Sequence, residues 1–195
     1  MRTVVVVGRD APTSADFPLD DLPGAGRMDL LARCVTAALL RSHGIRESVQ
    51  VRLVLSDSFT VRFDGATLQG LHPDERSTAA LVRATLDERE AAIGHIPVET
   101  SPGVSLVRMG LAETLAAAGG QVYRLHEDGQ PAADCAPPAN PTLVLSDHRS
   151  FRVEDAVILE DADARRLSLG PTVLHADHAI TVAHNWLDTD GFETY

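Results

Sequence analysis

The four consecutive valines at positions 4–7 constrain the fold more than any other feature of this chain. A short run of β-branched residues is typical of a strand buried on both faces, as in a parallel or mixed sheet covered by helices on each side. The loop-forming sequence Gly8-Arg9-Asp10 follows directly. The chain has 195 residues, 44% of them hydrophobic, which is enough for one substantial core. We therefore expect a single α/β domain over residues 1–195, with a mostly parallel sheet flanked by helices.

Strand and helix patterns alternate along the rest of the chain, which supports this fold class. Glycine and proline separate the segments, as they commonly do at the ends of helices and strands. The predicted strands are Gln50–Leu55, Phe59–Phe63, Gln121–Leu125 and Thr142–Leu145, the last two being possible partners. The predicted helices are Met28–Leu40, Arg76–Ile93 and Leu111–Ala118. A polar, proline-rich loop is expected between Gly129 and Pro138.

The charges are strongly unbalanced, with 28 acidic residues against 17 basic ones. Every basic residue is arginine, and the chain contains no lysine. A dense acidic surface keeps a protein soluble in concentrated salt, so we hypothesise a halophilic source. Biased genomic base composition would produce the same pattern. At about 1 M salt the Debye length falls to roughly 3 Å, so a nucleic-acid ligand would be recognised through local arginine contacts, shape and stacking.

Several classes of protein lose support from features that the sequence lacks. No stretch approaches the roughly 18 apolar residues of a membrane span, and the N-terminus does not resemble a signal peptide, so we expect a cytoplasmic protein. Only Cys34 and Cys135 are present, which gives neither a disulfide framework nor a cysteine zinc site. Dinucleotide-binding, P-loop and nucleophile-elbow motifs are missing as well.

The segment from Leu167 to His178 is the most suggestive one, because Gly170-Pro171 joins a predicted short strand to a predicted helix. Glycine lets a ligand approach the backbone closely, and free amides at the start of a helix bind acceptor groups. Taken alone, an ordinary strand–turn–helix corner is the simpler interpretation. The predicted helix has one apolar face, which we expect to pack in the core or in a dimer interface. This face consists of Ala179, Ile180, Ala183, Trp186 and Leu187.

Two polar clusters are candidates for chemistry. His175 and His178, joined by Asp177 or His184, have side chains suited to zinc, iron or manganese. The helix lacks a His-Glu-x-x-His arrangement, and histidines near helix starts are more often hydrogen-bonding groups, so we expect no metal. A His/Asp metal-dependent hydrolase remains an alternative.

The second cluster is the run Asp74-Glu75-Arg76-Ser77-Thr78. Its residues are well suited to capping the predicted helix that follows. In a functional interpretation, Arg76 faces an RNA phosphate or base while a neighbouring carboxylate assists proton removal. The sequence alone leaves both interpretations open.

Six segments, in order along nearly the whole chain, resemble the archaeal tRNA pseudouridine-54 N1-methyltransferase family. The segments are GRDAPT at 8–13, DERST at 74–78, SPGVS at 101–105, LSDH at 145–148, LGPTVLHADH at 169–178 and HNWLD at 184–188. The resemblance implies a SPOUT fold with a C-terminal trefoil knot, placed at about residues 120–190. It also implies a homodimer with active sites at its interface and tRNA as partner, with neither DNA nor a membrane.

The family binds S-adenosylmethionine through its knot loops, and the resemblance transfers this role to matching positions. The implied cofactor contacts are Leu125, Ser146, Leu169, Gly170, Pro171, Thr172, Val173, Leu174 and Ala179. Two of them depart from the expected pattern, since Ser146 stands where glycine is expected and Ala179 where cysteine is expected.

The implied reaction is methyl transfer to N1 of pseudouridine 54 in the T-loop of tRNA. Such a reaction requires positioning of the nucleoside and a modest general base for the N1 proton. We expect Arg76 to orient the substrate and Asp74, Glu75 or Asp10 to take the proton. A SPOUT enzyme that modifies another RNA, such as rRNA, is the nearest alternative, and a non-catalytic binding module is a further one.

Overall fold

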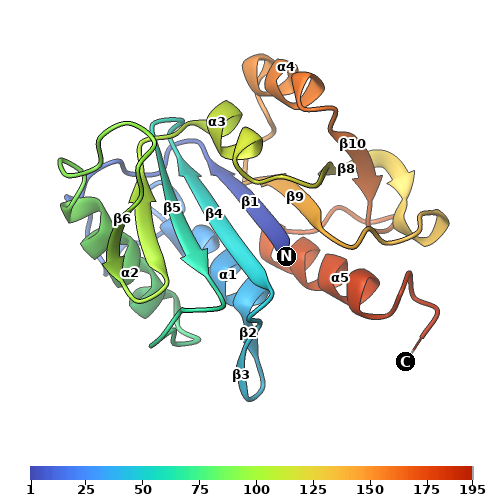
Figure 1. The fold of residues 1–195 in the computed structure, drawn as a ribbon, viewed down its shortest axis with the longest axis horizontal. Coiled ribbons are helices and arrows are strands. Elements are labelled where there is room, and N and C mark those ends of the chain that lie inside the picture. The colour runs from blue at the N-terminus through green and yellow to red at the C-terminus, as the bar shows by residue number, and fades with distance from the viewer. Residues whose placement is uncertain (195) are drawn as a thin grey trace.

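The computed structural model describes residues 1–194 and is built around an eight-stranded sheet (Figure 1). Its strands are β1 (Arg2–Gly8), β4 (Val49–Leu55), β5 (Phe59–Asp64), β6 (Val98–Ser101), β7 (Val104–Val107), β8 (Gln121–Pro131), β9 (Pro141–Ser146) and β10 (Arg165–Ser168). Their order across the sheet is β10-β8-β9-β1-β4-β5-β7-β6. The first five strands in this order run parallel, and β5, β7 and β6 continue the sheet in antiparallel pairs.

The central position of β1 explains its valine run. Val4, Val5 and Val6 are completely buried, because β1 pairs with β9 on one side and β4 on the other while helices cover both faces. Val4 and Val6 belong to one core cluster and Val5 to another, as the alternation of side chains along a strand requires. The prediction of a buried strand in a helix-covered, mostly parallel sheet is confirmed.

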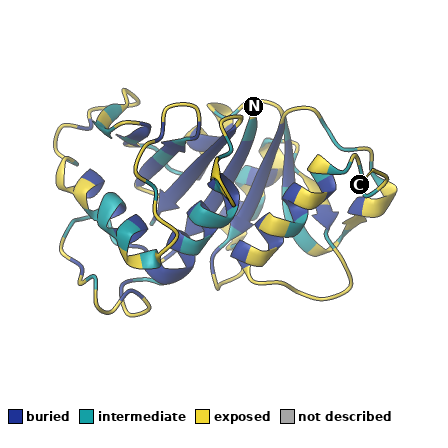
Figure 2. Ribbon diagram, turned by 90° about the horizontal axis from the view of Figure 1, so that it is seen from below, coloured by how far each residue is buried: buried dark blue, intermediate teal, exposed yellow. Residues whose placement is uncertain are grey.

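Three helices pack on one face of the sheet and two on the other (Figure 2). The first face carries α1 (Met28–Leu39), α2 (Glu75–Asp87) and α5 (Ala176–Asp188), and the second carries α3 (Leu111–Ala116) and α4 (Val153–Asp161). In Figure 2 the helices show dark, buried sides toward the strands and exposed sides toward solvent. No helix among residues 1–194 is long and apolar enough to cross a membrane.

The predicted strands agree with the structure within a few residues, except for Gln121–Leu125, which extends to Pro131 as β8 and shortens the predicted loop. Its pairing with the strand at 142–145 is confirmed. The helix predicted at 76–93 was too long, because α2 ends at Asp87. Beyond it, the amides of Arg89 and Ala92 each donate to the carbonyl three residues earlier, which is a turn and not an α-helix. The helix predicted at 111–118 ends at Ala116.

Elements without a clear sequence pattern were missed. They are the hairpin of β6 and β7, the helix α4, and the small hairpin of β2 (Leu40–Arg41) and β3 (Gly44–Ile45). The strands are only two to four residues long, and α4 exposes Val153 and Val157 on its outer side. Such segments lack the apolar periodicity on which sequence prediction depends.

Strand β8 leaves the sheet ladder in its middle and returns to it. It pairs with β10 at Tyr123 and Arg124 and again at Gln130 and Pro131, so residues 125–129 form an excursion. Gly129 permits the return, because a Cβ atom there would lie 2.5 Å from backbone atoms of Leu167. The excursion places residues 125–127 beside the carboxyl ends of β9 and β10, where the candidate site lies.

Candidate functional site

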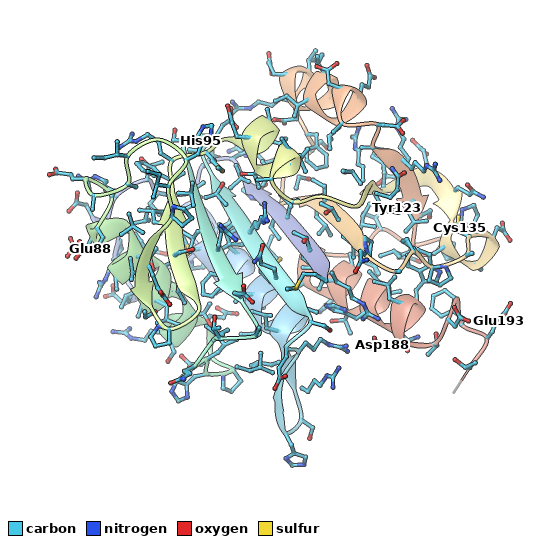
Figure 3. All side chains as sticks on the ribbon, in the orientation of Figure 1. Glu88, His95, Tyr123, Cys135, Asp188 and Glu193 are labelled. Atoms are coloured by element: carbon cyan, nitrogen blue, oxygen red, sulfur yellow. The ribbon has the colours of Figure 1, made fainter. Side chains whose placement is uncertain are left out.

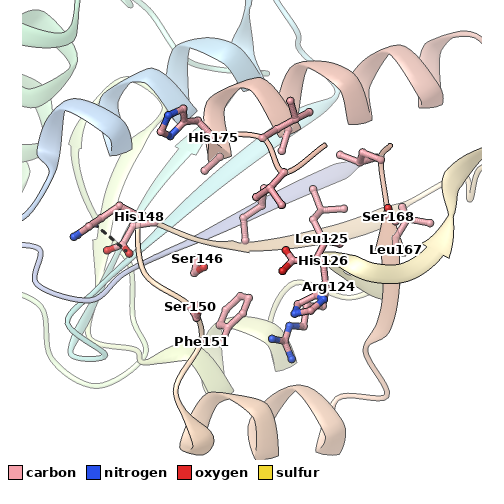
Figure 4. Close-up of a pocket in the computed structure, with 18 of the residues that line it drawn as sticks. Arg124, Leu125, His126, Ser146, His148, Ser150, Phe151, Leu167, Ser168 and His175 are labelled. Atoms are coloured by element: carbon pink, nitrogen blue, oxygen red, sulfur yellow. Dashed lines mark ion pairs between the residues drawn. The ribbon is translucent and has the colours of Figure 1, made fainter. Parts of the chain in front are cut away.

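A cavity of about 320 Å³ lies at the carboxyl ends of β8, β9 and β10 (Figure 4). Three segments form its walls: residues 124–127 of the β8 excursion, residues 145–151 after β9, and residues 167–176 between β10 and α5. Open α/β sheets commonly bind ligands at this edge of parallel strands. The volume falls in the usual range for a small-molecule site. We call this cavity the main pocket.

The residues expected to contact the cofactor gather around the main pocket, although they come from distant parts of the sequence. Those that line it are Leu125, Ser146, Leu169, Gly170, Thr172, Val173, Leu174 and Ala179. Pro171 belongs to the same loop but does not line the cavity. Their contact with a cofactor stays a prediction, whereas their convergence is a feature of the structure.

The loop between β10 and α5 combines apolar walls with free backbone groups. Leu169 and Leu174 line the cavity, and the loop has no helical or strand hydrogen bonding over most of its length. Gly170 has φ +153°, a conformation that side chains of L-residues rarely adopt. Val173 is 71% exposed. Apolar walls and backbone amides suit an adenosine with an attached amino acid, so the residues present fit S-adenosylmethionine.

Asp147 is a buried carboxylate in the wall of the main pocket. One of its oxygens accepts the backbone amide of Arg9 at 2.9 Å, and the other accepts the amide of Arg149 at 2.8 Å. The amide of Asp147 donates to the carbonyl of Val7 at 3.0 Å. Asp147 therefore fixes the loop after β1 to the loop after β9. The family resemblance implies a role for its neighbour Ser146 and none for Asp147, although a carboxylate directly after a buried strand is a signal in the sequence.

The loop after β1 also contacts α4 through a buried ion pair between Arg9 and Asp155. Burial lowers the pKa of the Arg9 guanidinium, and the nearby charge of Arg152 lowers it further. Asp155 accepts the amide of Arg152 at 2.7 Å as well, which caps α4. These contacts hold the start of α4 beside the main pocket.

Asp10 lies at the rim of the main pocket. Its carboxylate is 2.8 Å from the guanidinium of Arg149, which lines the cavity. Both side chains are substantially exposed, so their contact is a surface ion pair of small energy. Of the four candidate catalytic residues, Asp10 is the one that the structure brings next to the expected cofactor contacts.

The other candidates lie together at the start of α2. Asp74 caps this helix by accepting the amide of Ser77 at 2.8 Å, and this hydrogen bond holds the pKa of the Asp74 carboxyl below its usual value. Glu75 lies 2.9 Å from Arg33, and Arg76 donates to the carbonyl of Leu19 at 3.3 Å. Asp74 therefore caps α2, as the capping interpretation of this run predicts.

Asp74 and Glu75 line a second, more open hollow between α1, α2 and α5, together with Asp177 and His178. Arg33 connects the three helices there, since it contacts Asp29, Glu75 and Asp177 at 2.9–3.2 Å. We call this the α2 hollow. Within one chain, its residues and those of the main pocket form separate groups.

The histidines near α5 do not form the ligand set that a metal-dependent hydrolase needs. The ring centroids of His175 and His178 are 6.2 Å apart. His184, the third histidine of this cluster, is buried, and its Nδ1 atom is 3.4 Å from the guanidinium of Arg2. Within residues 1–194 no three histidine, cysteine or acidic side chains are grouped so that they could hold a metal ion.

Comparison with solved structures defines the fold. Archaeoglobus fulgidus Nep1 bound to S-adenosylhomocysteine superposes with a TM-score of 0.66, covering 96% of this chain and 97% of that one. The two sequences are 11% identical, so the likeness concerns the fold alone. The chain has this α/β fold, with the main pocket at the carboxyl ends of its parallel strands.

Sequence comparison then defines the family. A family model described as "Putative SAM-dependent RNA methyltransferase" matches residues 1–192, and the chain belongs to this family. A tRNA (pseudouridine(54)-N(1))-methyltransferase of Haloarcula marismortui is 61% identical, and one of Haloferax volcanii is 57% identical, each over the full length of both chains. A protein of the same name from Methanocella arvoryzae is 40% identical over 97% of this chain and 99% of its own.

Proposed function

We propose that this chain transfers the methyl group of S-adenosylmethionine to N1 of pseudouridine 54 in the T-loop of tRNA. The observation that carries this proposal is the 61% identity, over the full length of both chains, to a relative named for that reaction. The main pocket supports it independently, because it offers a cavity of suitable size where the family's cofactor contacts are expected.

The chain's own residues would hold the cofactor by shape and by backbone hydrogen bonds. Leu125, Leu169 and Leu174 provide apolar walls, and the irregular backbone at 169–174 provides amides and carbonyls. S-adenosylmethionine supplies a methyl group made electrophilic by its sulfonium. The protein must then bring N1 of the nucleoside in line with that methyl group and exclude competing orientations.

Transfer forms a bond between N1 and the methyl carbon and breaks the bond between that carbon and sulfur, while the N1 proton leaves to a base. Asp10 is our choice for the base. Its carboxylate is exposed at the rim of the main pocket, and its one ion-pair partner, Arg149, lines that pocket. Asp74 and Glu75 are engaged in capping and in the Arg33 contacts of the α2 hollow.

A homodimer is part of the proposal. Arg76, Asp74 and Glu75 lie away from the main pocket of their own chain, so they would reach a pocket only if a second copy brought its α2 beside it. Exposed Val173 and Leu174 at the pocket would gain cover from such a copy. Analytical ultracentrifugation would test this point, and a stable monomer under active conditions would contradict it.

The cellular setting and chain path follow as further proposals. The relatives from Haloarcula and Haloferax support a halophilic source, and tRNA as substrate supports a cytoplasmic location. An activity and solubility maximum at low salt would contradict the first. The single domain with a trefoil knot at about residues 120–190 is also proposed. An experimental structure in which the chain after β10 does not pass through a preceding loop would contradict the knot.

The decisive experiment is nucleoside mass spectrometry after incubation of the protein with S-adenosylmethionine and tRNA at high salt. We expect N1-methylpseudouridine with tRNA that carries pseudouridine 54, and no product with matched tRNA that carries uridine 54. Cofactor binding without methylation of this tRNA would indicate another RNA substrate, such as rRNA. Absence of cofactor binding at every salt concentration would indicate a non-catalytic binding module.

A further inference from the structure

Two arginines lie side by side on the sheet next to the main pocket. Arg124 of β8 and Arg166 of β10 are directly paired in the parallel register. Their neighbours Val122 and Leu167 belong to core clusters on opposite faces of the sheet. Because side chains alternate along a strand, Arg124 and Arg166 both project to the face that carries α4. There the guanidinium of Arg124 lies 4.8 Å from the ring centroid of Phe151.

Neither of these two arginines forms an ion pair within the part of the chain that the structure describes. The Nε atom of Arg124 is buried and has no hydrogen-bond partner. Burial lowers the pKa of Arg124, and the charge of Arg166 lowers it further. Like charges on directly neighbouring strand positions repel, so this arrangement costs free energy in the protein alone.

Some buried arginines of this protein have internal partners, although the Nε atoms of Arg9 and Arg62 lack a hydrogen bond within residues 1–194, as that of Arg124 does. Arg9 pairs with Asp155, and Arg52 donates to Gln50 and to the carbonyls of Thr114 and Ala117 at 2.9–3.0 Å. The chain carries 28 acidic residues and has a net charge of −11, so a carboxylate partner was readily available in composition. Arg124 differs from Arg62 in its position, because Arg124 lines the main pocket, where an external anion can reach its guanidinium.

The position of the pair identifies the kind of anion. Arg124 lines the main pocket with His126 and Phe151, and Figure 4 shows these residues near α4, across the cavity from His175. Arg166 is exposed on β10, the edge strand of the sheet. The pair thus extends from the pocket to an open edge that a large polyanion can reach. Guanidinium groups match phosphate oxygens in geometry and charge.

We propose that Arg124 and Arg166 together bind one phosphate of the RNA substrate and hold the neighbouring nucleotide at the main pocket. This inference rests on the proposed function, since it assumes an RNA substrate at that pocket. The phosphate neutralises the two repelling guanidinium groups and gives the buried Nε atom of Arg124 an acceptor. Phe151 keeps the guanidinium of Arg124 in place through its ring.

Arg166→Gln is the main test variant, because Arg166 is exposed and its replacement removes no buried group. Arg62→Gln is the matched control, because Arg62 lies outside the main pocket. Arg62 is a partly buried arginine of β5 and is paired in register with another arginine, Arg52. Within residues 1–194 its Nε atom also lacks a hydrogen-bond partner. The readouts are the Kd for fluorescently labelled tRNA carrying pseudouridine 54, measured over a series of salt concentrations, and the Kd for S-adenosylmethionine by calorimetry.

We expect Arg166→Gln to raise the Kd for tRNA about tenfold at moderate salt and to reduce the slope of log Kd against log salt by about one. The Kd for S-adenosylmethionine should not change, and Arg62→Gln should bind tRNA as the parent protein does. Arg124→Lys, which keeps the charge but loses the planar fork, should weaken tRNA binding less than Arg124→Gln.

Three outcomes would overturn the inference: equal losses in the Arg166 and Arg62 variants, no loss in either, or weaker cofactor binding with unchanged tRNA binding. The last result would assign the pair to the cofactor carboxylate. The binding assay also separates this inference from the proposed function. Binding of tRNA that depends on Arg166, without methylation by the parent protein, would keep the phosphate site and refute the reaction. If the parent protein methylates tRNA and Arg166→Gln binds tRNA with unchanged affinity, the reaction is supported and the phosphate site is refuted.

Discussion

The main pocket and the α2 hollow contain similar types of charged residue, but the two sites differ in how fully these residues have partners within the protein. In the α2 hollow, Arg33 contacts three carboxylates, and Asp74 is engaged in capping α2. In the main pocket, the buried Nε atom of Arg124 has no hydrogen-bond partner within residues 1–194, and residues 169–175 after β10 form no helix or strand. Charged residues that satisfy one another stabilise a fold, whereas groups left without partners are available to a ligand. A cluster of charges in the sequence does not distinguish the two cases.

Replacement of two of the candidate bases, one at each site, tests this comparison most strongly. Asp10→Asn at the main pocket should lower kcat by roughly 10²–10⁴, because a general base contributes about that much. Glu75→Gln in the α2 hollow is the matched change and should have a much smaller effect on kcat. Single-turnover methylation with saturating cofactor and tRNA would measure both rates. A larger loss in the Glu75 variant would place the base on α2 and support delivery from a second protomer.

Gly129→Ala should produce the next largest effect, because a Cβ atom 2.5 Å from the backbone of Leu167 forces β8 and β10 apart. We expect a loss of about 1–3 kcal/mol in unfolding free energy, which is typical of overpacking. Weaker binding of S-adenosylmethionine should accompany it. Gln130→Ala, at the neighbouring exposed position of β8, is the control, because it adds no atom between the strands. Urea unfolding and cofactor titration give the two readouts, and an unchanged cofactor affinity would show that the excursion does not shape the pocket.

Asp147→Asn sharpens the comparison within the main pocket. The amide cannot accept hydrogen bonds at both positions, so the contact to Arg9 or to Arg149 is lost in a buried site. We expect a loss of about 1–3 kcal/mol in unfolding free energy, because a buried donor is left unsatisfied. Binding of S-adenosylmethionine should also weaken. Asp87→Asn, at an exposed position on α2, should leave both quantities unchanged; equal effects of the two variants would show that Asp147 has no special role.

The last effect depends on pH and lies outside both sites. Burial, with the charges of Arg46 and Arg2, lowers the pKa of His184 to about 4. Unfolded histidine titrates near 6.5, so as the pH falls from about 6.5 to 4 the unfolded chain binds a proton that the folded chain does not. This histidine should therefore lower the unfolding free energy by up to about 3 kcal/mol over that range. His184→Gln should reduce this pH dependence, measured as the difference in urea unfolding between pH 7 and 4.5. Equal pH dependence in both proteins would contradict it.

The same network shows why His184 stays neutral. Asp188 lies at the end of α5, where Figure 3 labels it. Its carboxylate is 2.7 Å from Arg46 and is also paired with Arg2. The two arginines hold the pKa of the Asp188 carboxyl below its usual value, although burial acts in the opposite direction. Their positive charges then oppose protonation of the neighbouring imidazole.

The fold class and the buried segments could be predicted where apolar residues recur over a long stretch of the sequence. The valine run of β1 and the helical spacing of α1 fixed the fold class and the burial of those segments. The hairpin of β6 and β7, with strands of four residues each, and the weakly amphipathic α4 carry no such pattern. The excursion of β8 depends on a register shift opposite Leu167, which local sequence does not specify.

The candidate site was predictable only in part. Family resemblance located eight residues that line the main pocket, and periodicity located none of them. The structure was required for Asp147, whose role depends on two loops meeting. It was also required for Arg124 and Arg166, which become neighbours only through the pairing of β8 with β10. For Asp74, capping and catalysis were both open interpretations, and the hydrogen bond to Ser77 shows that this side chain caps α2.

Strand β10 forms one edge of the sheet, and an unprotected edge can recruit a strand from another molecule. Arg165 and Arg166 are both exposed on this strand. Charged side chains on an edge oppose such self-association, so the two arginines protect the protein against aggregation whether or not RNA is bound. An apolar residue at position 166 would therefore harm solubility as well as RNA binding, which is why glutamine is the better replacement there.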